Sequence, residues 1–282
     1  TGLPIKDAET DTGHVQKLPG SYALTGTENG VGLFDLSQIV GKDNIGSITA
    51  VKGGTYDKKT GIARYSAAVE KPSYTYATGS NAVALTVEFT LDMSKLPKSP
   101  FTDVTAGAWF YDAVLYAYNK GLMVGTSDTA FGPDVPMTRA MLVAVLHRLA
   151  GSPSVSGKMP FTDVEADTWY TEAVLWAYQN DIVAGTSGTT FEPLSNITRE
   201  QIVAIFSRYT AKFAPDKAKA TAELTAFADS ASVSDWAVND MKWAVAQKII
   251  GGRENGGRLY LAPQGNASRA EVATILMQYC AL

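Results

Sequence analysis

The stretch Ile197-Thr198-Arg199-Glu200-Gln201 sets the organisation of the chain, because closely similar stretches lie on either side of it. Met137-Thr138-Arg139-Ala140-Met141 precedes it and Ala267-Ser268-Arg269-Ala270-Glu271 follows it. In each copy a hydroxyl residue and an arginine stand before an apolar run with helical spacing. The hydroxyl residue is predicted to be the N-cap, whose side-chain oxygen accepts a hydrogen bond from an amide of the first turn. The sequence therefore predicts three equivalent helix starts.

The third residue of each predicted helix determines whether a capping box can close. Gln201 and Glu271 occupy this position in the second and third copies, where their side chains can accept a hydrogen bond from the N-cap amide. Met141 occupies it in the first copy and offers no such acceptor. We therefore expect two capping boxes and one helix with a simple N-cap.

The similarity extends well beyond the helix starts. Phe101-Thr102-Asp103-Val104 matches Phe161-Thr162-Asp163-Val164, and the offset of 60 residues holds without a gap as far as the arginines. A third copy begins at Phe227-Ala228-Asp229 and contains small insertions. Because one copy cannot bury its own apolar helix faces, the copies are expected to pack together. All five tryptophans fall at two equivalent places, Trp109, Trp169 and Trp236 at one and Trp176 and Trp243 at the other.

The repeats set the predicted domain organisation. Residues 98–152, 158–212 and 224–282 are predicted to form three units, each consisting of a helix, a loop with a short extended piece, and a second helix. Three quasi-equivalent units favour a compact, mainly α-helical, pseudo-threefold body over a rod.

Residues 1–97 have a different character, since apolar residues from residue 20 to residue 93 recur with a period of two. Residues 1–19 are polar and are expected to be a tail or linker. Asp57–Gly61 is typical of a hairpin turn. We predict an all-β, immunoglobulin-like sandwich that serves as a spacer or interaction module. Its candidate strands are Ser21–Thr25, Val31–Leu36, Ser47–Val51, Ile62–Val69, Ser73–Ala77 and Ala82–Leu91.

Composition excludes several classes of function. With 45% hydrophobic residues, 18% charged residues, a net charge of −4 and no basic cluster, the chain has no electrostatic basis for binding nucleic acid. The single cysteine, Cys280, rules out a disulfide framework and favours a bacterial surface over a eukaryotic secretion route. No apolar stretch reaches the roughly 18 residues of a transmembrane helix. A signal peptide is absent from the chain, and we expect it to have been removed.

Several motifs together identify a family resemblance. Phe-x-Asp-Val, a tryptophan eight residues after the phenylalanine, Gly125-Thr126-Ser127, Phe-x-Pro and Ile197-Thr198-Arg199 resemble S-layer homology (SLH) domains, here as a C-terminal triplet. The resemblance implies non-covalent anchoring of an extracellular bacterial surface protein to secondary cell-wall polysaccharide, often through pyruvylated N-acetylmannosamine. It implies binding grooves between neighbouring repeats, other surface-layer subunits as further partners, and no cofactor.

The resemblance assigns the binding arginines to Arg139, Arg199 and Arg269. An arginine at the first helical position would lie beside free amides and could bind a pyruvyl carboxylate in a planar, bidentate manner. Purely structural pairing is the alternative for these arginines. The candidate set also contains Asp103, Asp163 and Asp229 as acceptors for sugar hydroxyls or as turn residues, and Trp109, Trp169 and Trp236 as stacking platforms, although the core is the commoner place for tryptophan. The turn glycines Gly125, Gly185 and Gly252 complete it.

The third repeat departs from the pattern at Ala267-Ser268 and through a glycine-rich insertion at Gly251–Gly257, so its groove is expected to be degenerate. No metal site is predicted, because the loop that begins at Asp163 has Thr168 and Val174 where a calcium loop requires glycine and glutamate. A hydrolase using Asp103 and Asp163 is one alternative function, but an acid and a base need two different environments, and these residues are repeat-equivalent. A purely structural lattice subunit is another. We therefore predict a binding protein and not an enzyme.

Overall fold

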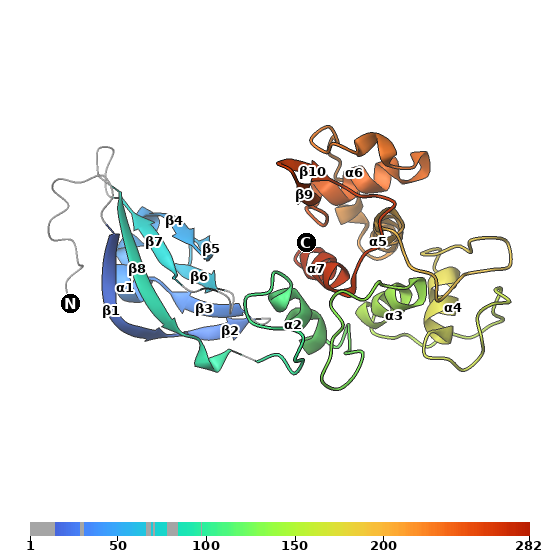
Figure 1. Ribbon diagram of the computed structural model, residues 1–282, viewed down its shortest axis with the longest axis horizontal. Helices are drawn as coiled ribbons and strands as arrows, with labels where there is room; N and C mark the ends of the chain where they lie inside the picture. The colour runs from blue at the N-terminus through green and yellow to red at the C-terminus, as the bar shows by residue number, and fades with distance from the viewer. Residues whose placement is uncertain (1–14, 29–30, 66–68, 70, 78–83, 97) are drawn as a thin grey trace. The chain divides into compact units, whose positions relative to one another are not determined.

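The computed structural model describes residues 15–28, 31–65, 69, 71–77, 84–96 and 98–282 (Figure 1). The chain divides into two compact units, residues 1–116 and residues 117–282.

The first unit contains two four-stranded sheets. One sheet has the order β1-β8-β7-β4, in which β1 is parallel to β8 and the other pairs are antiparallel. The other sheet has the order β2-β3-β6-β5 and is antiparallel throughout. The strands are β1 (Val15–Ala23), β2 (Gly26–Glu28), β3 (Val31–Asp35), β4 (Ile48–Lys52), β5 (Gly54–Asp57), β6 (Ile62–Tyr65), β7 (Ser73–Tyr76) and β8 (Leu85–Asp92), with a short helix α1 (Ser37–Val40) after β3.

Aromatic side chains from both sheets form the core of this unit. The ring of Phe89 on β8 lies 5.6 Å from that of Phe34 on β3 and 5.9 Å from that of Tyr65 on β6, measured between ring centroids. Along β8, Phe89 is buried while the neighbouring Thr90 is exposed. The alternation read from the sequence is therefore confirmed for this strand.

The hairpin predicted at Asp57–Gly61 is confirmed, since β5 and β6 pair in antiparallel register from Asp57 and Ile62. The tail predicted for residues 1–19 is wrong for residues 15–19, which belong to β1. These residues pair with β8, for example through Lys17 and Glu88, and a partner strand so distant in sequence leaves no local signal. Residues 1–14, and parts of the strands predicted at Ile62–Val69 and Ala82–Leu91, lie outside the described residues.

The repeats form the helix-loop-helix units expected from the sequence. Helix α3 packs against α4, and α5 packs against α6. The loop of the third repeat carries the glycine-rich insertion as a two-stranded ribbon, β9 with β10. The elements are α2 (Tyr111–Asn119), α3 (Arg139–Leu149), α4 (Thr171–Gln179), α5 (Arg199–Phe213), α6 (Val238–Ala246), β9 (Arg253–Asn255), β10 (Arg258–Tyr260) and α7 (Arg269–Cys280).

The N-caps are confirmed in all three repeats. Thr138 accepts a hydrogen bond from the amide of Met141, without a capping box. Thr198 and Ser268 each close a full capping box, with Gln201 and Glu271.

A closed ring of backbone hydrogen bonds joins the residues just before the three caps. The amide of Met137 donates to Ala267, that of Ile197 donates to Met137, and that of Ala267 donates to Ile197, over 2.8, 2.9 and 3.3 Å. All three side chains are fully buried. The three repeats are thus linked in a cycle, each to both of the others.

Candidate functional site

The arginine that follows each cap reaches into a loop of another repeat. Arg139 is buried, and its Nε donates to the carbonyl of Phe191 at 2.8 Å, while its Nη2 donates to that of Ala184 at 3.4 Å. Its guanidinium lies 4.7 Å from the centroid of the Phe191 ring, a cation–π contact. Arg199 donates in the same way to Leu261, and Arg269 to Phe131. Much of each guanidinium is therefore committed to joining repeats.

The amides at the helix starts are not free, so the expectation that these amides would help to bind an anion is wrong. The amide of Arg139 donates to Ser195 at 3.0 Å and that of Ala140 donates to Pro193 at 2.9 Å. The amides of Arg199, Glu200, Arg269 and Ala270 are occupied by the corresponding loop carbonyls. Because a neighbouring repeat satisfies these donors, they have no hydrogen bond to offer a ligand.

The aspartates Asp163 and Asp229 contact the same loops, by accepting hydrogen bonds from their backbone amides. The carboxylate of Asp163 accepts from the amides of Phe191 and Glu192 at 2.8 and 2.7 Å. Burial is the largest influence and raises the pKa of Asp163, but these amides and other backbone contacts outweigh it, so the pKa is lowered overall. Asp229 accepts from the amides of Leu261 and Ala262, both at 2.8 Å. Asp103 belongs to the other compact unit.

The tryptophans divide into two structural classes. Trp109, Trp169 and Trp236 are 66%, 57% and 54% exposed, so the core interpretation is wrong for them. Trp176 and Trp243, which follow them in the same repeats, are buried. Trp109 and Trp169 lie in the loop before a helix and Trp236 lies in a short 3-10 helix before α6, whereas Trp176 lies within α4 and Trp243 within α6.

The first groove has a volume of about 260 Å³ and a largely apolar wall. It combines the loop and helix α3 of the first repeat with Trp169 of the second repeat and Arg269 of the third. The lining residues are Met123, Val124, Gly125, Thr126, Met137, Met141, Val145, Arg148, Trp169 and Arg269.

The second groove has a volume of about 390 Å³ and is built in the same way, from the loop and helix α5 of the second repeat, Trp236 of the third and Arg139 of the first. Two arginines, Arg139 and Arg208, contribute to it, and none of its described lining residues is acidic. The lining residues are Arg139, Val183, Ala184, Gly185, Thr186, Gln201, Ala204, Ile205, Arg208 and Trp236.

Arg208 and Arg148 are groove residues that the sequence reasoning missed. They are related by the same offset of 60 residues as the rest of the first two repeats, and this offset was the available signal. Arg208 is exposed and makes no hydrogen bond or ion pair with any residue that the structure describes. Arg148 is partly engaged, since its Nη1 donates to the carbonyl of Leu122 at 3.1 Å. In the third repeat the corresponding residue is Gln278, which is uncharged.

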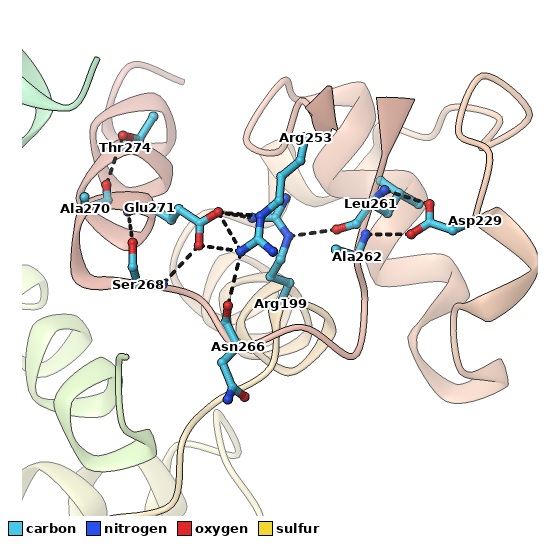
Figure 2. A network of polar contacts seen from close by, with 10 residues as sticks. All are labelled: Arg199, Asp229, Arg253, Leu261, Ala262, Asn266, Ser268, Ala270, Glu271 and Thr274. Carbon is cyan, nitrogen blue, oxygen red and sulfur yellow. Dashed lines mark hydrogen bonds and ion pairs between the residues drawn. The ribbon is translucent and has the colours of Figure 1, made fainter. Parts of the chain in front are cut away.

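In the third repeat, Glu271 lies between two arginines (Figure 2). Nη1 of Arg199 donates to its carboxylate at 3.3 Å, and Nε and Nη2 of Arg253, on β9, donate at 2.7 and 2.8 Å. Burial is the largest influence and raises the pKa of Glu271, but Arg253, the Ser268 amide and Arg199 together lower it. The charge of Arg199 is thus balanced within the protein.

Two of the turn glycines, Gly185 and Gly252, lie where a side chain would not fit. A Cβ on Gly185 would lie 2.3 Å from the carbonyl oxygen of Ser187 and 2.5 Å from that of Thr190. Gly252 has a φ of +80°, and a Cβ there would lie 2.8 Å from the Phe227 ring. Gly125 and Gly185 also line the first and second grooves.

The protein is thus of the class of repeat-built modules in which each groove combines elements of different repeats. The family model of the S-layer homology domain matches residues 100–140, 160–203 and 226–273. The C-terminal part of the chain is accordingly a triplet of S-layer homology domains.

Similar proteins include enzymes and surface-layer proteins. The chain is 33% identical over 168 residues to an amylopullulanase of Thermoanaerobacterium thermosulfurigenes, covering 60% of this chain and 9% of that protein. It is 30% identical over 183 residues to an endoglucanase of Bacillus sp. (strain KSM-635), covering 65% and 19%. It is 30% identical over 166 residues to a surface-layer 125 kDa protein of Lysinibacillus sphaericus, covering 58% and 13%.

The chain therefore spans less than a fifth of the length of each of these relatives. The S-layer homology domains and the surface-layer relatives support cell-wall anchoring and indicate a location at the cell surface. Within the described residues, no helix has both the length and the apolar character needed to cross a membrane.

Proposed function

We propose that this chain anchors a bacterial surface protein to the cell wall by binding pyruvylated secondary cell-wall polysaccharide, of the pyruvylated N-acetylmannosamine type, without catalysis. The observation that carries the proposal is the second groove, where Arg139 and Arg208 meet an exposed Trp236 and the described lining contains no carboxylate. Two arginines in a lining without a carboxylate favour an anionic ligand, although Asp163 and Glu192 act on Arg139 from outside the lining and Arg208 acts on Asp240. An exposed indole offers a flat surface to a sugar ring.

The ligand carboxylate is assigned to the arginines of this groove. Nη1 of Arg139 has no hydrogen-bond partner among the described residues, and all the donors of Arg208 are free of such partners. A charge-assisted hydrogen bond from either would contribute about 1.5–3 kcal/mol. Thr186 and Gln201 line the same groove and are assigned to sugar hydroxyls. The first groove, with Arg148, Arg269 and Trp169, is proposed as a second site of more apolar character.

The third repeat is proposed not to bind an anionic sugar. Glu271 holds Arg199 and Arg253, so a carboxylate of the protein takes the place that a ligand carboxylate would occupy. At the equivalent positions Met141 and Gln201 are uncharged, so neither residue places a carboxylate of the protein in its groove.

The architecture supports binding at two grooves of one rigid body. We infer that residues 98–152, 158–212 and 224–282 form a pseudo-threefold body, and the closed hydrogen-bonded ring of Met137, Ile197 and Ala267 supports this. Residues 1–97 are inferred to be an immunoglobulin-like sandwich that acts as a spacer or as a contact with other surface-layer subunits. Contacts between the two sheets through Phe34 and Phe89 support the sandwich.

Calorimetry with small sugars tests this function. The methyl glycoside of pyruvylated N-acetylmannosamine should bind, and the same glycoside without the pyruvyl group should bind at least about tenfold more weakly. Arg208→Ala should weaken binding of the pyruvylated sugar at one site, whereas Gln278→Ala, at the equivalent position of the third repeat, should not. Equal affinity for the two sugars would overturn the assignment of the carboxylate.

A further inference from the structure

A second hollow adjoins the second groove. It has a volume of about 380 Å³ and shares Val183, Ala184 and Arg208 with the groove. We call it the adjoining hollow, and its lining residues are Tyr178, Gln179, Asp181, Val183, Ala184 and Arg208. Because three residues line both spaces, a ligand in the groove can continue into the hollow past Arg208.

The two spaces differ in charge. The second groove has two arginines and no described acidic residue in its lining, whereas the lining of the adjoining hollow contains both Asp181 and Arg208. A carboxylate repels an anionic sugar and accepts hydrogen bonds from hydroxyl groups. The hollow is therefore suited to an uncharged sugar with several hydroxyls.

An aromatic ring supplies a surface for such a sugar. Tyr178 lies near the end of helix α4, and its side chain is 42% exposed. Its ring meets that of Phe161 edge to face, with the ring centroids 5.3 Å apart. This contact holds the ring in place while leaving part of it open to solvent.

The backbone places Asp181 just after the end of helix α4. Asp181 has a φ of +60°, a left-handed conformation that costs an ordinary residue about 1 kcal/mol or more. In the first repeat the equivalent residue is Gly121, with a φ of +67°, which adopts this conformation without strain. In the third repeat the equivalent residue is Lys248, with a φ of +58°, so the left-handed residue is a feature of this helix end in every repeat, and only the second repeat has a carboxylate there.

We propose that the adjoining hollow is a second sugar subsite, which binds an uncharged, hydroxyl-rich sugar unit linked to the anionic unit in the second groove. The inference rests on the proposed function of that groove. Tyr178 stacks on the uncharged sugar, and the Asp181 carboxylate accepts from its hydroxyls. Nε2 of Gln179 donates to Ser156 at 2.9 Å, so the amide oxygen is the group that Gln179 offers to the sugar. Arg208 contacts both units.

The experiment compares the pyruvylated monosaccharide with the pyruvylated disaccharide, both released from purified wall polysaccharide. Calorimetry is done on the full chain carrying Trp169→Ala, which removes the aromatic surface of the first groove. The disaccharide should bind about tenfold more tightly than the monosaccharide. Tyr178→Ala should remove that advantage and leave the monosaccharide affinity unchanged. Tyr118→Ala, at the equivalent position of the first repeat, should change neither.

A second variant guards against a loss of folding. Asp181→Asn keeps a side chain that tolerates the left-handed backbone, and it should reduce only the affinity for the disaccharide, by about threefold. If the monosaccharide binds and the disaccharide binds no more tightly, or if Tyr178→Ala weakens both equally, the subsite is overturned while the proposed function stands. If the monosaccharide does not bind at all, the proposed function itself fails.

Discussion

Arg139 and Asp163 hold the same residue, Phe191, by the two polar groups of its backbone. Nε of Arg139 donates to the Phe191 carbonyl at 2.8 Å, and the Asp163 carboxylate accepts from the Phe191 amide at 2.8 Å. Arg199 and Asp229 hold Leu261 in the same way, at 2.7 and 2.8 Å. The arginine and the aspartate come from successive repeats, so these two recurrent residues of the motif fasten the repeats together.

Asp163 and Arg139 together hold the backbone of Phe191. Removing Asp163 should destabilise the protein without a direct effect on sugar binding. Asp163→Ala leaves the amides of Phe191 and Glu192 without their acceptor, and we expect a loss of about 1–3 kcal/mol in the free energy of unfolding. Urea denaturation measures it. Asp134→Ala, at an exposed position in the equivalent loop of the first repeat, is the control and should cost less than about 0.5 kcal/mol. Equal stability of the two variants would contradict the stabilising role of the Asp163 hydrogen bonds.

Acid should weaken the same contacts. The folded-state pKa of Asp163 lies below its ordinary value of 3.8, and that of Glu271 lies below 4.5. A depressed carboxyl pKa contributes stability that is fully present above the unfolded-state value and is lost as the pH falls through the folded-state value. Stability should therefore decline below about pH 4.5. Asp163→Asn, measured by thermal unfolding from pH 7 to pH 3, should show a shallower decline than the wild type.

The ion pairs of Glu271 with Arg199 and Arg253 should stabilise the folded protein and take no part in sugar binding. Glu271→Gln removes the charge that balances Arg199 and Arg253, and we expect it to lower the free energy of unfolding by about 2–3 kcal/mol. Affinity for the pyruvylated sugar should not fall, because the grooves that bind it lie elsewhere. A clear loss of sugar affinity in the folded variant, measured by calorimetry, would place binding in the third repeat after all.

The residue at the third helical position should control anion binding in the second groove. Gln201→Glu retains an acceptor for the capping box but introduces a carboxylate beside Arg139, as Glu271 does beside Arg199. The affinity for the pyruvylated sugar at this site should fall at least about tenfold. Gln201→Met, which copies the first groove, should retain most of the affinity. If calorimetry gives the two variants the same affinity, the charge at this position is irrelevant.

The two classes of tryptophan should respond oppositely to substitution. Trp236 is 54% exposed in the second groove, so Trp236→Ala should weaken sugar binding there and cost little stability. Trp243 is 3% exposed, and Trp243→Ala should cost about 3–5 kcal/mol through loss of core packing. Thermal unfolding and calorimetry on both variants separate the two effects. A large loss of stability for Trp236→Ala would show that Trp236 contributes to core packing instead of sugar binding.

Local patterns in the sequence determined the secondary structure of the repeats. The positions of Thr138, Thr198 and Ser268 as caps, and the presence of two capping boxes, followed from residues three positions apart. The alternation along β8 predicted its buried face. The recurrence of whole motifs identified the S-layer homology domains. Each of these signals lies within one helix turn, one strand or one repeat. Over such short distances, the separation of two residues in the sequence determines their separation in the structure.

The contacts that the motif residues make depend on the packing of distant parts of the chain. The hydrogen bonds of Arg139, Arg199 and Arg269 reach carbonyls 52, 62 and 138 residues away, and no periodicity indicates such partners. The same long-range packing covers the helix-start amides, leaves Trp236 exposed, and brings Arg208 to the rim of a groove. Whether a polar group is available to a ligand depends on which distant groups already satisfy it, and the folded chain sets those neighbours.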